Sequence, residues 1–182
     1  MKRNRNVRAQ KGFTLVEVMI SMFILTFGVL SLASIFTQGV KASYQTQMQY
    51  IAEQKAQEAL ETIFTARDTK LLTWSQIANV SKGGVFKDGP QPLCDAGPDG
   101  LFGTVDDITT KPDVVTVAPG PDGVFGTSDD IVMNLNPWMT RTIVISPLAS
   151  TPNLNQITVT VAWTYGGQSS QVVVTSYISN YA

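Results

Sequence analysis

The junction between Gly12 and Phe13 is the point at which this sequence could undergo a specific covalent change. Residues 1–12 carry five basic side chains and no acid, and the apolar run from Phe13 to Phe36 has Glu17 as its only charge. Cleavage after Gly12 would remove the basic leader and create a positive amine on Phe13. As a helix the run would measure ~36 Å, enough to cross a hydrocarbon core of ~30 Å. A carboxylate in such a span needs a partner, so we expect Glu17 to pair with the Phe13 amine of a neighbouring subunit and set their register.

Two simpler interpretations of the same residues remain open. Glu17 could lie at the headgroup level of an ordinary membrane anchor. The segment could also be a conventional signal peptide cut near Ala33-Ser34, because signal peptidases cleave after the apolar stretch. Neither interpretation explains why a Gly-Phe junction lies so close to the only acid of the run.

An internal repeat supplies the second set of residues with chemical potential. Residues 97–108 recur as 120–131, with ten of twelve positions identical, and the interval 95–130 holds eight aspartates against Lys111 alone. Counted from Asp95, an EF-type calcium loop would have Asp99 at position 5, Gly100 at position 6 and Asp106 at position 12. Position 3 is a glycine, and the second copy lacks an acid at position 1. We therefore expect calcium at an irregular loop, with Asp95, Asp99, Asp106, Asp107, Asp122, Asp129 and Asp130 as candidate ligands.

The alternative for the repeat is a pair of plain turns. Pro-Asp-Gly favours a turn by itself, since proline restricts φ and glycine adopts positive φ. In that case the two loops would be hairpin tips, with Phe102 and Phe125 packing inward. Paired aspartates could also act as general acid and base, but the chain has no histidine, no Ser/His or Cys/His relay and no phosphate-binding loop. The sequence thus predicts a protein that is not an enzyme.

The elements that position these residues have clear periodicities. No proline interrupts residues 13–67, and apolar side chains recur every three or four positions from Val40 to Phe64, which predicts one long helix. Near the C-terminus, residues 157–163 and 172–176 alternate around Gly166-Gly167, which predicts a β-hairpin over 156–178. With a strand at 142–146, the fold class is α+β: a long N-terminal helix packed against a small antiparallel β-sheet, with an irregular Asp/Gly-rich insertion.

Charge and cysteine content further limit the possible functions and the disulfide bonding of the chain. The leader holds five of the 13 basic residues, so residues 13–182 carry 8 basic and 14 acidic side chains, a net charge of −6. A nucleic-acid-binding protein would show a basic patch instead. Cys94 is the single cysteine, so no disulfide forms within the chain; it is either a free thiol or a small loop residue.

The N-terminal sequence Gly12-Phe-Thr-Leu-Val-Glu17 resembles the processing motif of type IV prepilins. The anchor that follows and the ending Val-x-Val-x-Trp-x-Tyr-Gly-Gly resemble the minor pilin and pseudopilin group that includes the pilus modification protein. The resemblance covers 11–66 closely and 142–178 loosely. Three features depart from many pilins: the C-terminal disulfide loop and the proline within the anchor are absent, and the repeat is additional.

The resemblance implies the following organisation: a leader at 1–12, a membrane or filament-core helix at 13–36, its amphipathic continuation at 37–66, and a globular head at 67–182. The head includes the insertion 95–131. It further implies cleavage after Gly12 by prepilin peptidase, N-methylation of Phe13, and a role for Glu17 in assembly. The expected function is a minor type IV pilin or pseudopilin, first a single-pass inner-membrane protein and then part of a periplasmic or cell-surface filament.

The expected partners are other pilin subunits, the inner membrane, prepilin peptidase, and the pilus or type II secretion assembly machinery, with no nucleic acid indicated. Two alternatives share the same anchor: a filament-tip adhesin and a calcium-dependent binding module. A membrane-anchored enzyme is the third class, and the missing catalytic groups disfavour it.

Overall fold

A computed structural model describes residues 12–136, 138–149 and 151–180. The chain comprises two compact units, one that ends at Thr46 and one that begins at Gln47. One helix, α1 (Leu15–Asp68), passes through both units. The predicted helix over 13–67 is therefore confirmed, and Gly28 and Gly39 do not interrupt it.

The second unit is an α+β head built on a four-stranded antiparallel sheet with the order β1-β6-β7-β8. The strands are β1 (Gln91–Pro92), β6 (Met139–Leu148), β7 (Thr151–Tyr165) and β8 (Gln168–Ser179). The predicted hairpin is confirmed: β7 and β8 pair along their length and turn at Gly166-Gly167, where both glycines have positive φ. The strand expected at 142–146 is longer than predicted and forms β6.

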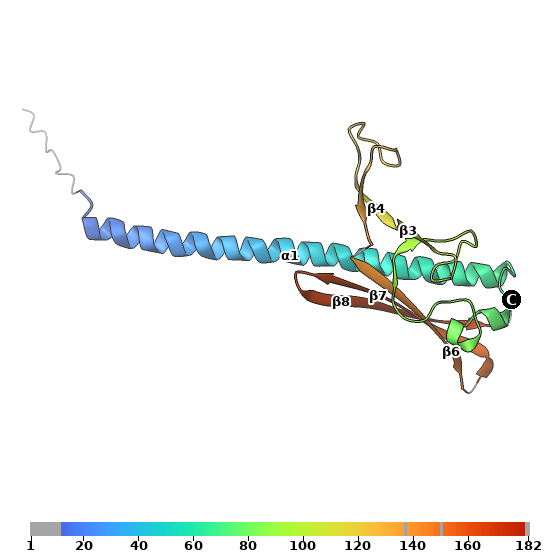
Figure 1. Cartoon of the computed structure of the whole chain (residues 1–182). Helices are drawn as coiled ribbons and strands as arrows, with labels where there is room; N and C mark the ends of the chain where they lie inside the picture. The colour runs from blue at the N-terminus through green and yellow to red at the C-terminus, as the bar shows by residue number, and fades with distance from the viewer. Residues whose placement is uncertain (1–11, 137, 150, 181–182) are drawn as a thin grey trace, which may run out of the picture. The chain divides into compact units, whose positions relative to one another are not determined.

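The described residues also form two small antiparallel ribbons of two strands each. The first pairs β2 (Cys94–Asp95) with β3 (Ile108–Pro112), and the second pairs β4 (Val114–Ala118) with β5 (Ile131–Asn134). Each ribbon closes one copy of the repeat, so each repeat is a loop at the end of an antiparallel pair. Two short 3-10 helices, Trp74–Gln76 and Val80–Lys82, lie between α1 and β1. Figure 1 shows the β4–β5 ribbon extending away from the four-stranded sheet.

The core of the head lies between α1 and the sheet. The predicted apolar face of the helix is buried from Met48 to Ile63, and the opposite face carries exposed polar side chains, among them Glu53, Gln57 and Glu61. Ala52, Ala56 and Ala59 are completely buried, which lets the helix backbone approach the strands closely. The sheet contributes alternate residues of its central strands, among them Ile143, Ile145, Ile157, Val159, Val161 and Trp163.

One buried asparagine closes the sheet edge beyond β1. The Asn79 amide donates to the Ile143 carbonyl oxygen at 2.8 Å, and its own oxygen accepts from the Ile145 amide at 2.8 Å. This side chain thus replaces a neighbouring strand along β6. Lys82 donates to the Ile145 carbonyl from the same side, at 2.8 Å. Asn79 and Lys82 thus occupy the β6 edge at Ile143 and Ile145, where unpaired backbone groups could otherwise pair with another chain.

Candidate functional site

The N-terminal motif begins with an accessible peptide segment. Gly12, Phe13 and Thr14 precede α1 without regular structure, and all three are exposed. A methyl group added to Gly12 would meet no atom of the described residues within 4 Å. Packing within this described part of the chain therefore does not require glycine at position 12. If glycine is required at position 12, the requirement comes from another molecule that binds the Gly12–Phe13 junction.

Thr14 and Glu17 form a reciprocal cap at the start of α1. The Glu17 amide donates to Thr14 Oγ1 at 3.3 Å, and Glu17 Oε2 accepts from the Thr14 amide at 3.2 Å and from its hydroxyl at 3.3 Å. This is a capping box, in which a glutamate at the third helical position satisfies a free amide, and its charge also suits the positive end of the helix dipole. The Thr-x-x-Glu spacing would have revealed this second role of Glu17, which sequence reasoning missed.

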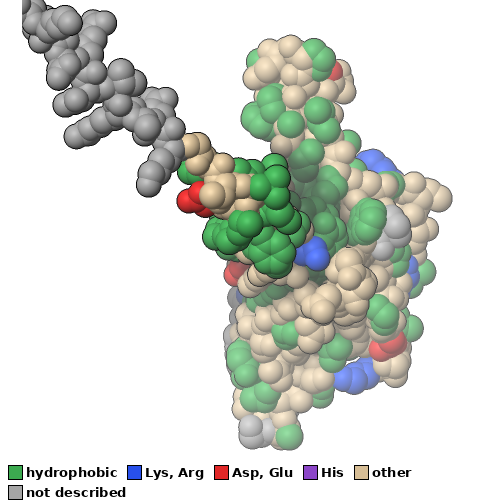
Figure 2. Space-filling model, turned by 90° about the vertical axis from the view of Figure 1, so that its left-hand side faces the viewer, with side chains coloured by type: hydrophobic (Ala, Val, Ile, Leu, Met, Phe, Trp, Pro, Cys, Tyr) green, Lys and Arg blue, Asp and Glu red, His purple; other side chains and the backbone are tan. Residues whose placement is uncertain are grey.

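The first unit of the chain presents an uncovered apolar helix surface. In Figure 2 hydrophobic side chains cover the helix surface nearest the viewer, and the large apolar residues from Leu15 to Val40 are exposed. The hydroxyls of Ser21, Thr26, Ser31 and Thr37 each donate to a carbonyl one turn earlier, so these polar groups are satisfied inside the helix. By length and composition α1 contains a stretch able to cross a membrane. The segment fits a membrane-anchored precursor.

The first repeat loop (residues 97–108, loop 1) is held by its own aspartates. Asp99 accepts from the Leu101 amide at 2.8 Å, and Asp106 accepts from the Asp99 amide at 3.3 Å. Asp107 accepts from the Gly103 amide at 2.8 Å and from the Thr104 amide and hydroxyl. These carboxylates thus fold the loop by accepting from its backbone.

The second loop (residues 120–131, loop 2) repeats the main bonds 23 positions later. Asp122 accepts from the Val124 amide at 2.8 Å, Asp129 from the Asp122 amide at 3.3 Å, and Asp130 from the Gly126 amide at 2.7 Å. The first glycine of each loop is required by packing: a methyl group on Gly97 or Gly120 would lie 2.4 or 2.3 Å from the backbone oxygen of Asp106 or Asp129. The repeat therefore encodes one compact loop fold, used twice.

The candidate calcium ligands are brought together only in pairs. Asp99 lies beside Asp106, and burial together with the Asp106 charge raises the pKa of Asp99. The Thr104 hydroxyl lowers the pKa of Asp106, and the Thr127 hydroxyl likewise lowers that of Asp129. Asp95 forms an ion pair with Lys111. Within the described residues no group of three or more acidic, cysteine or histidine side chains is arranged to hold a metal. Calcium binding therefore stays a prediction.

The two loops differ in what covers them. In loop 1, Leu101 is 2% and Phe102 8% exposed; the matching residues of loop 2, Val124 and Phe125, are 56% and 64% exposed. The expectation that both phenylalanines pack inward is correct for Phe102 and wrong for Phe125. The physical reason is tertiary: loop 1 packs on the head, where the Arg141 guanidinium lies 4.3 Å from the Phe102 ring centre, whereas loop 2 ends the β4–β5 ribbon.

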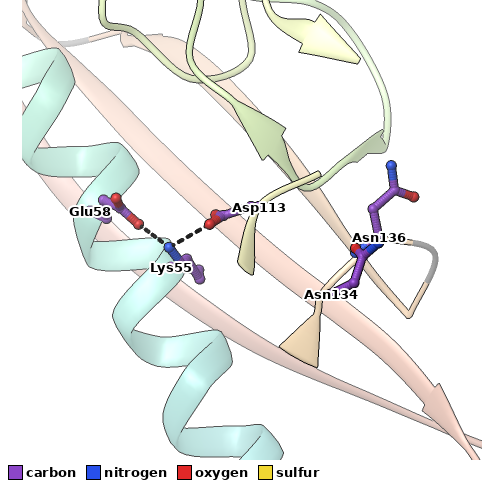
Figure 3. A network of polar contacts seen from close by, with 5 residues as sticks. All are labelled: Lys55, Glu58, Asp113, Asn134 and Asn136. Atoms are coloured by element: carbon purple, nitrogen blue, oxygen red, sulfur yellow. Dashed lines mark hydrogen bonds and ion pairs between the residues drawn. The ribbon is translucent and has the colours of Figure 1, made fainter. Parts of the chain in front are cut away.

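A polar network joins the base of the β4–β5 ribbon to the helix (Figure 3). Lys55 Nζ lies 2.8 Å from Glu58 Oε2 and 2.9 Å from Asp113 Oδ1. The Asp113 backbone bonds to the neighbouring segments through the Leu93 oxygen and the Leu135 amide. Burial lowers the pKa of Lys55, but its bonds to the two carboxylates and their charges outweigh burial and raise it. Asp113 thus fixes the start of β4 against α1.

Comparison with known proteins identifies a family motif at the N-terminus. Residues 7–33 match the family model of the prokaryotic N-terminal methylation motif. No curated protein and no solved structure matches the chain. The matched range contains the Gly12–Phe13 junction, the capping pair and most of the uncovered apolar helix. The match supports a type IV pilin-like precursor processed by prepilin peptidase.

Proposed function

We propose that this chain is a minor type IV pilin or pseudopilin, a structural subunit that joins a filament through the N-terminal part of α1. The observation that carries the proposal is the Gly12–Phe13 junction: an exposed, irregular peptide segment directly before a helix whose apolar surface is uncovered. Cleavage there leaves the apolar helix on the mature chain, ready to exchange lipid for neighbouring helices. N-methylation of Phe13 would follow cleavage.

Glu17 has two successive roles in this proposal. In the single chain it caps α1 through Thr14. In the filament its carboxylate takes the Phe13 amine of a neighbouring subunit, because an unpaired charge among packed apolar helices is costly. Such a pair sets axial register, the best-attested use of a buried ionic contact.

The partners follow from the proposed life cycle. The precursor spans the inner membrane once and meets prepilin peptidase there. The mature chain then passes to a pilus or type II secretion assembly machinery and packs with other pilin subunits in a periplasmic or cell-surface filament. The head, with a net acidic charge outside the leader, faces outward.

Mass spectrometry of the native protein tests this function. Filaments sheared from the source cells should contain this chain with Phe13 as its N-terminus, carrying one added methyl group. The chain should be missing from the sheared fraction of cells that lack prepilin peptidase. A mature N-terminus at Ser34, or retention of Met1 in exported protein, would refute the proposal.

A calcium-dependent binding module on the same anchor, at a filament tip, is the second candidate. The observation that favours it is the closeness of Asp99 and Asp106 in loop 1, where burial, together with the Asp106 charge, raises the pKa of Asp99. A divalent cation would relieve this repulsion. A tip protein would be scarce relative to the main filament subunit, so copy number in the sheared fraction separates the two candidates.

A further inference from the structure

Loop 2 carries the same contact residues as loop 1 but lacks the surface that loop 1 contacts. Phe125 corresponds to Phe102, and Asp130 corresponds to Asp107. Phe102 lies under Arg141, whereas Phe125 is exposed. Asp107 Oδ1 accepts from Thr104 of its own loop, whereas the shielded Asp130 Oδ1 has no hydrogen-bond partner among the described residues. Loop 2 therefore repeats the main bonds of loop 1, but its phenylalanine is left without a covering surface.

Loop 1 shows what kind of surface this motif fits. Its phenylalanine ring packs beneath a guanidinium, and a methyl group on Gly103 would come within 2.8 Å of the Ile143 side chain, so loop and strand are in close contact. Burial lowers the pKa of Arg141, and the Asp107 charge is the strongest of the acidic influences that oppose this lowering. The surface that covers loop 1 thus consists of an arginine beside an aliphatic side chain, and the loop aspartate supplies a charge opposite to that of the arginine.

The β4–β5 ribbon that carries loop 2 has unpaired strand edges. Within the described residues β4 and β5 form a sheet of two strands, with no neighbour on either edge. Isolated two-stranded sheets are marginally stable in water. Hydrophobic side chains are visible on this ribbon at the top of Figure 2. The exposed large apolar residues here are Val114, Val117, Val124, Phe125, Ile131 and Val132.

Charge decides which partner can cover this surface. Residues 114–134 contain Asp122, Asp129 and Asp130 and no basic residue, so a nucleic acid or an anionic membrane would be repelled. A second copy of this chain offers no free arginine after removal of the leader: Arg141 lies over Phe102, and Arg67 lies over Phe64 and binds Asp68. We infer from the arginines that the partner is a different protein.

We propose that the tip of the β4–β5 ribbon, centred on Phe125 and Asp130, is a docking site for another protein that presents an arginine beside an aliphatic side chain. Phe125 packs under the guanidinium as Phe102 packs under Arg141, and Asp130 supplies an opposite charge close to it. This contact is separate from the filament contacts of α1, and only the exclusion of a second copy as the partner rests on the leader removal in the proposed function.

Site-specific photocrosslinking of the full chain in its source cells tests the docking site. The photoreactive residue p-benzoylphenylalanine replaces Phe125 in one strain and Tyr177, an exposed aromatic on β8, in a control strain. We expect an adduct from position 125 only, on a single partner protein, at a peptide that contains or adjoins an arginine. Adding Asp130→Asn should lower the adduct yield about tenfold, which corresponds to ~1.4 kcal/mol and is typical of an interface residue that contributes to binding. Glu53→Gln, an exposed acid on α1, should leave the yield unchanged.

Several outcomes would overturn the docking site: no adduct, an adduct with lipid or with a second copy of this chain, equal yields from positions 125 and 177, a crosslinked surface without an arginine, or a yield that Asp130→Asn does not change. The amount of this chain in sheared filaments, measured in the same cells, reports separately on the proposed filament function. A negative crosslinking result therefore does not affect the test of the filament function, and a negative filament result does not affect the crosslinking test.

Discussion

Thr14 and Glu17 form three hydrogen bonds with each other at the first turn of α1, with lengths of 3.2 to 3.3 Å. The finding gives Glu17 a local role besides the proposed pairing with a neighbour's Phe13 amine. The two roles have different chemical requirements. A capping box accepts glutamine as well as glutamate, whereas an ion pair with an amine requires the charge.

Glu17→Gln separates these roles. The variant should keep the helix cap and insert into the membrane as well as the wild type, since it removes the only charge of the apolar run. Its incorporation into filaments should fall by at least about tenfold, because an unpaired buried amine costs several kcal/mol. The measurement is the ratio of this chain in sheared filaments to that in membranes.

Thr14→Ala is the matched control for Glu17→Gln. It removes the hydroxyl of the cap but leaves the carboxylate, so incorporation should change little. If Glu17→Gln assembles like wild type while Thr14→Ala does not, Glu17 acts through the cap alone and the intersubunit pair is wrong.

Gly12→Ala tests whether a peptidase reads the junction. An added methyl group meets open space, so the structure of the precursor should not change. Cleavage should nevertheless be abolished or strongly slowed, and the leader should remain on the membrane-bound chain in immunoblots. Gly28→Ala, also in open space within α1, should be processed normally. Normal cleavage of the Gly12 variant would remove the main support for prepilin processing.

Replacing the phenylalanine with alanine should affect the stability of the head very differently in the two loops. Phe102→Ala removes a buried ring under Arg141 and should destabilise the head by about 3–5 kcal/mol. Phe125→Ala removes an exposed ring and should change stability by less than about 0.5 kcal/mol. Thermal unfolding of a fragment of residues 41–182 measures both. Equal losses would mean that loop 2 also packs on the head.

This difference between the loops lies beyond what the sequence could predict. The long helix followed from unbroken periodicity without proline, and the β7–β8 hairpin from alternation around Gly166-Gly167. Loops 1 and 2 are nearly identical locally, so local reasoning assigned both phenylalanines the same environment. Arg141 and Ile143, which lie beside loop 1 alone, are about 40 residues away in the chain, and no local pattern links them to it.

The network at Lys55 predicts a pH-dependent contribution to stability. Lys55→Met should lower the stability of the head by about 1–3 kcal/mol at pH 7, because Asp113 loses a charged partner in a mostly buried position. The folded state raises the pKa of Lys55 above its ordinary value of 10.5. The contribution is therefore complete below pH 10.5 and is lost as the pH rises through the folded-state pKa.

Melting temperatures of wild type and Lys55→Met should thus converge as the pH rises above 10.5, when measured on the fragment of residues 41–182. Asp113→Asn should resemble Lys55→Met at pH 7, and the double variant should lose little more than either single one. Additive losses, or a difference between wild type and Lys55→Met that persists in strong alkali, would show that the ion pair does not stabilise the head.

Calcium binding to the repeat loops remains a proposal that stability can test. Asp99 and Asp106 lie together in loop 1, and Asp122 and Asp129 occupy the same positions in loop 2. A cation that binds only the folded state, at 100 times its dissociation constant, adds about 2.7 kcal/mol of stability, which is several degrees of melting temperature for a domain of this size. The fragment of residues 41–182 should therefore melt higher in millimolar calcium than in chelator, and magnesium should substitute poorly.

Replacing Asp99 and Asp106 with asparagine should remove most of the calcium-dependent difference. Asp113→Asn is the control: it should lower the melting temperature in both conditions, through the lost contact with Lys55, and leave the difference between calcium and chelator unchanged. The structure shows how the loops could instead hold themselves, since each aspartate already accepts from backbone amides of its own loop. Equal melting in calcium and chelator would mean that these internal bonds suffice, and that the aspartates of the repeat serve to build two turns.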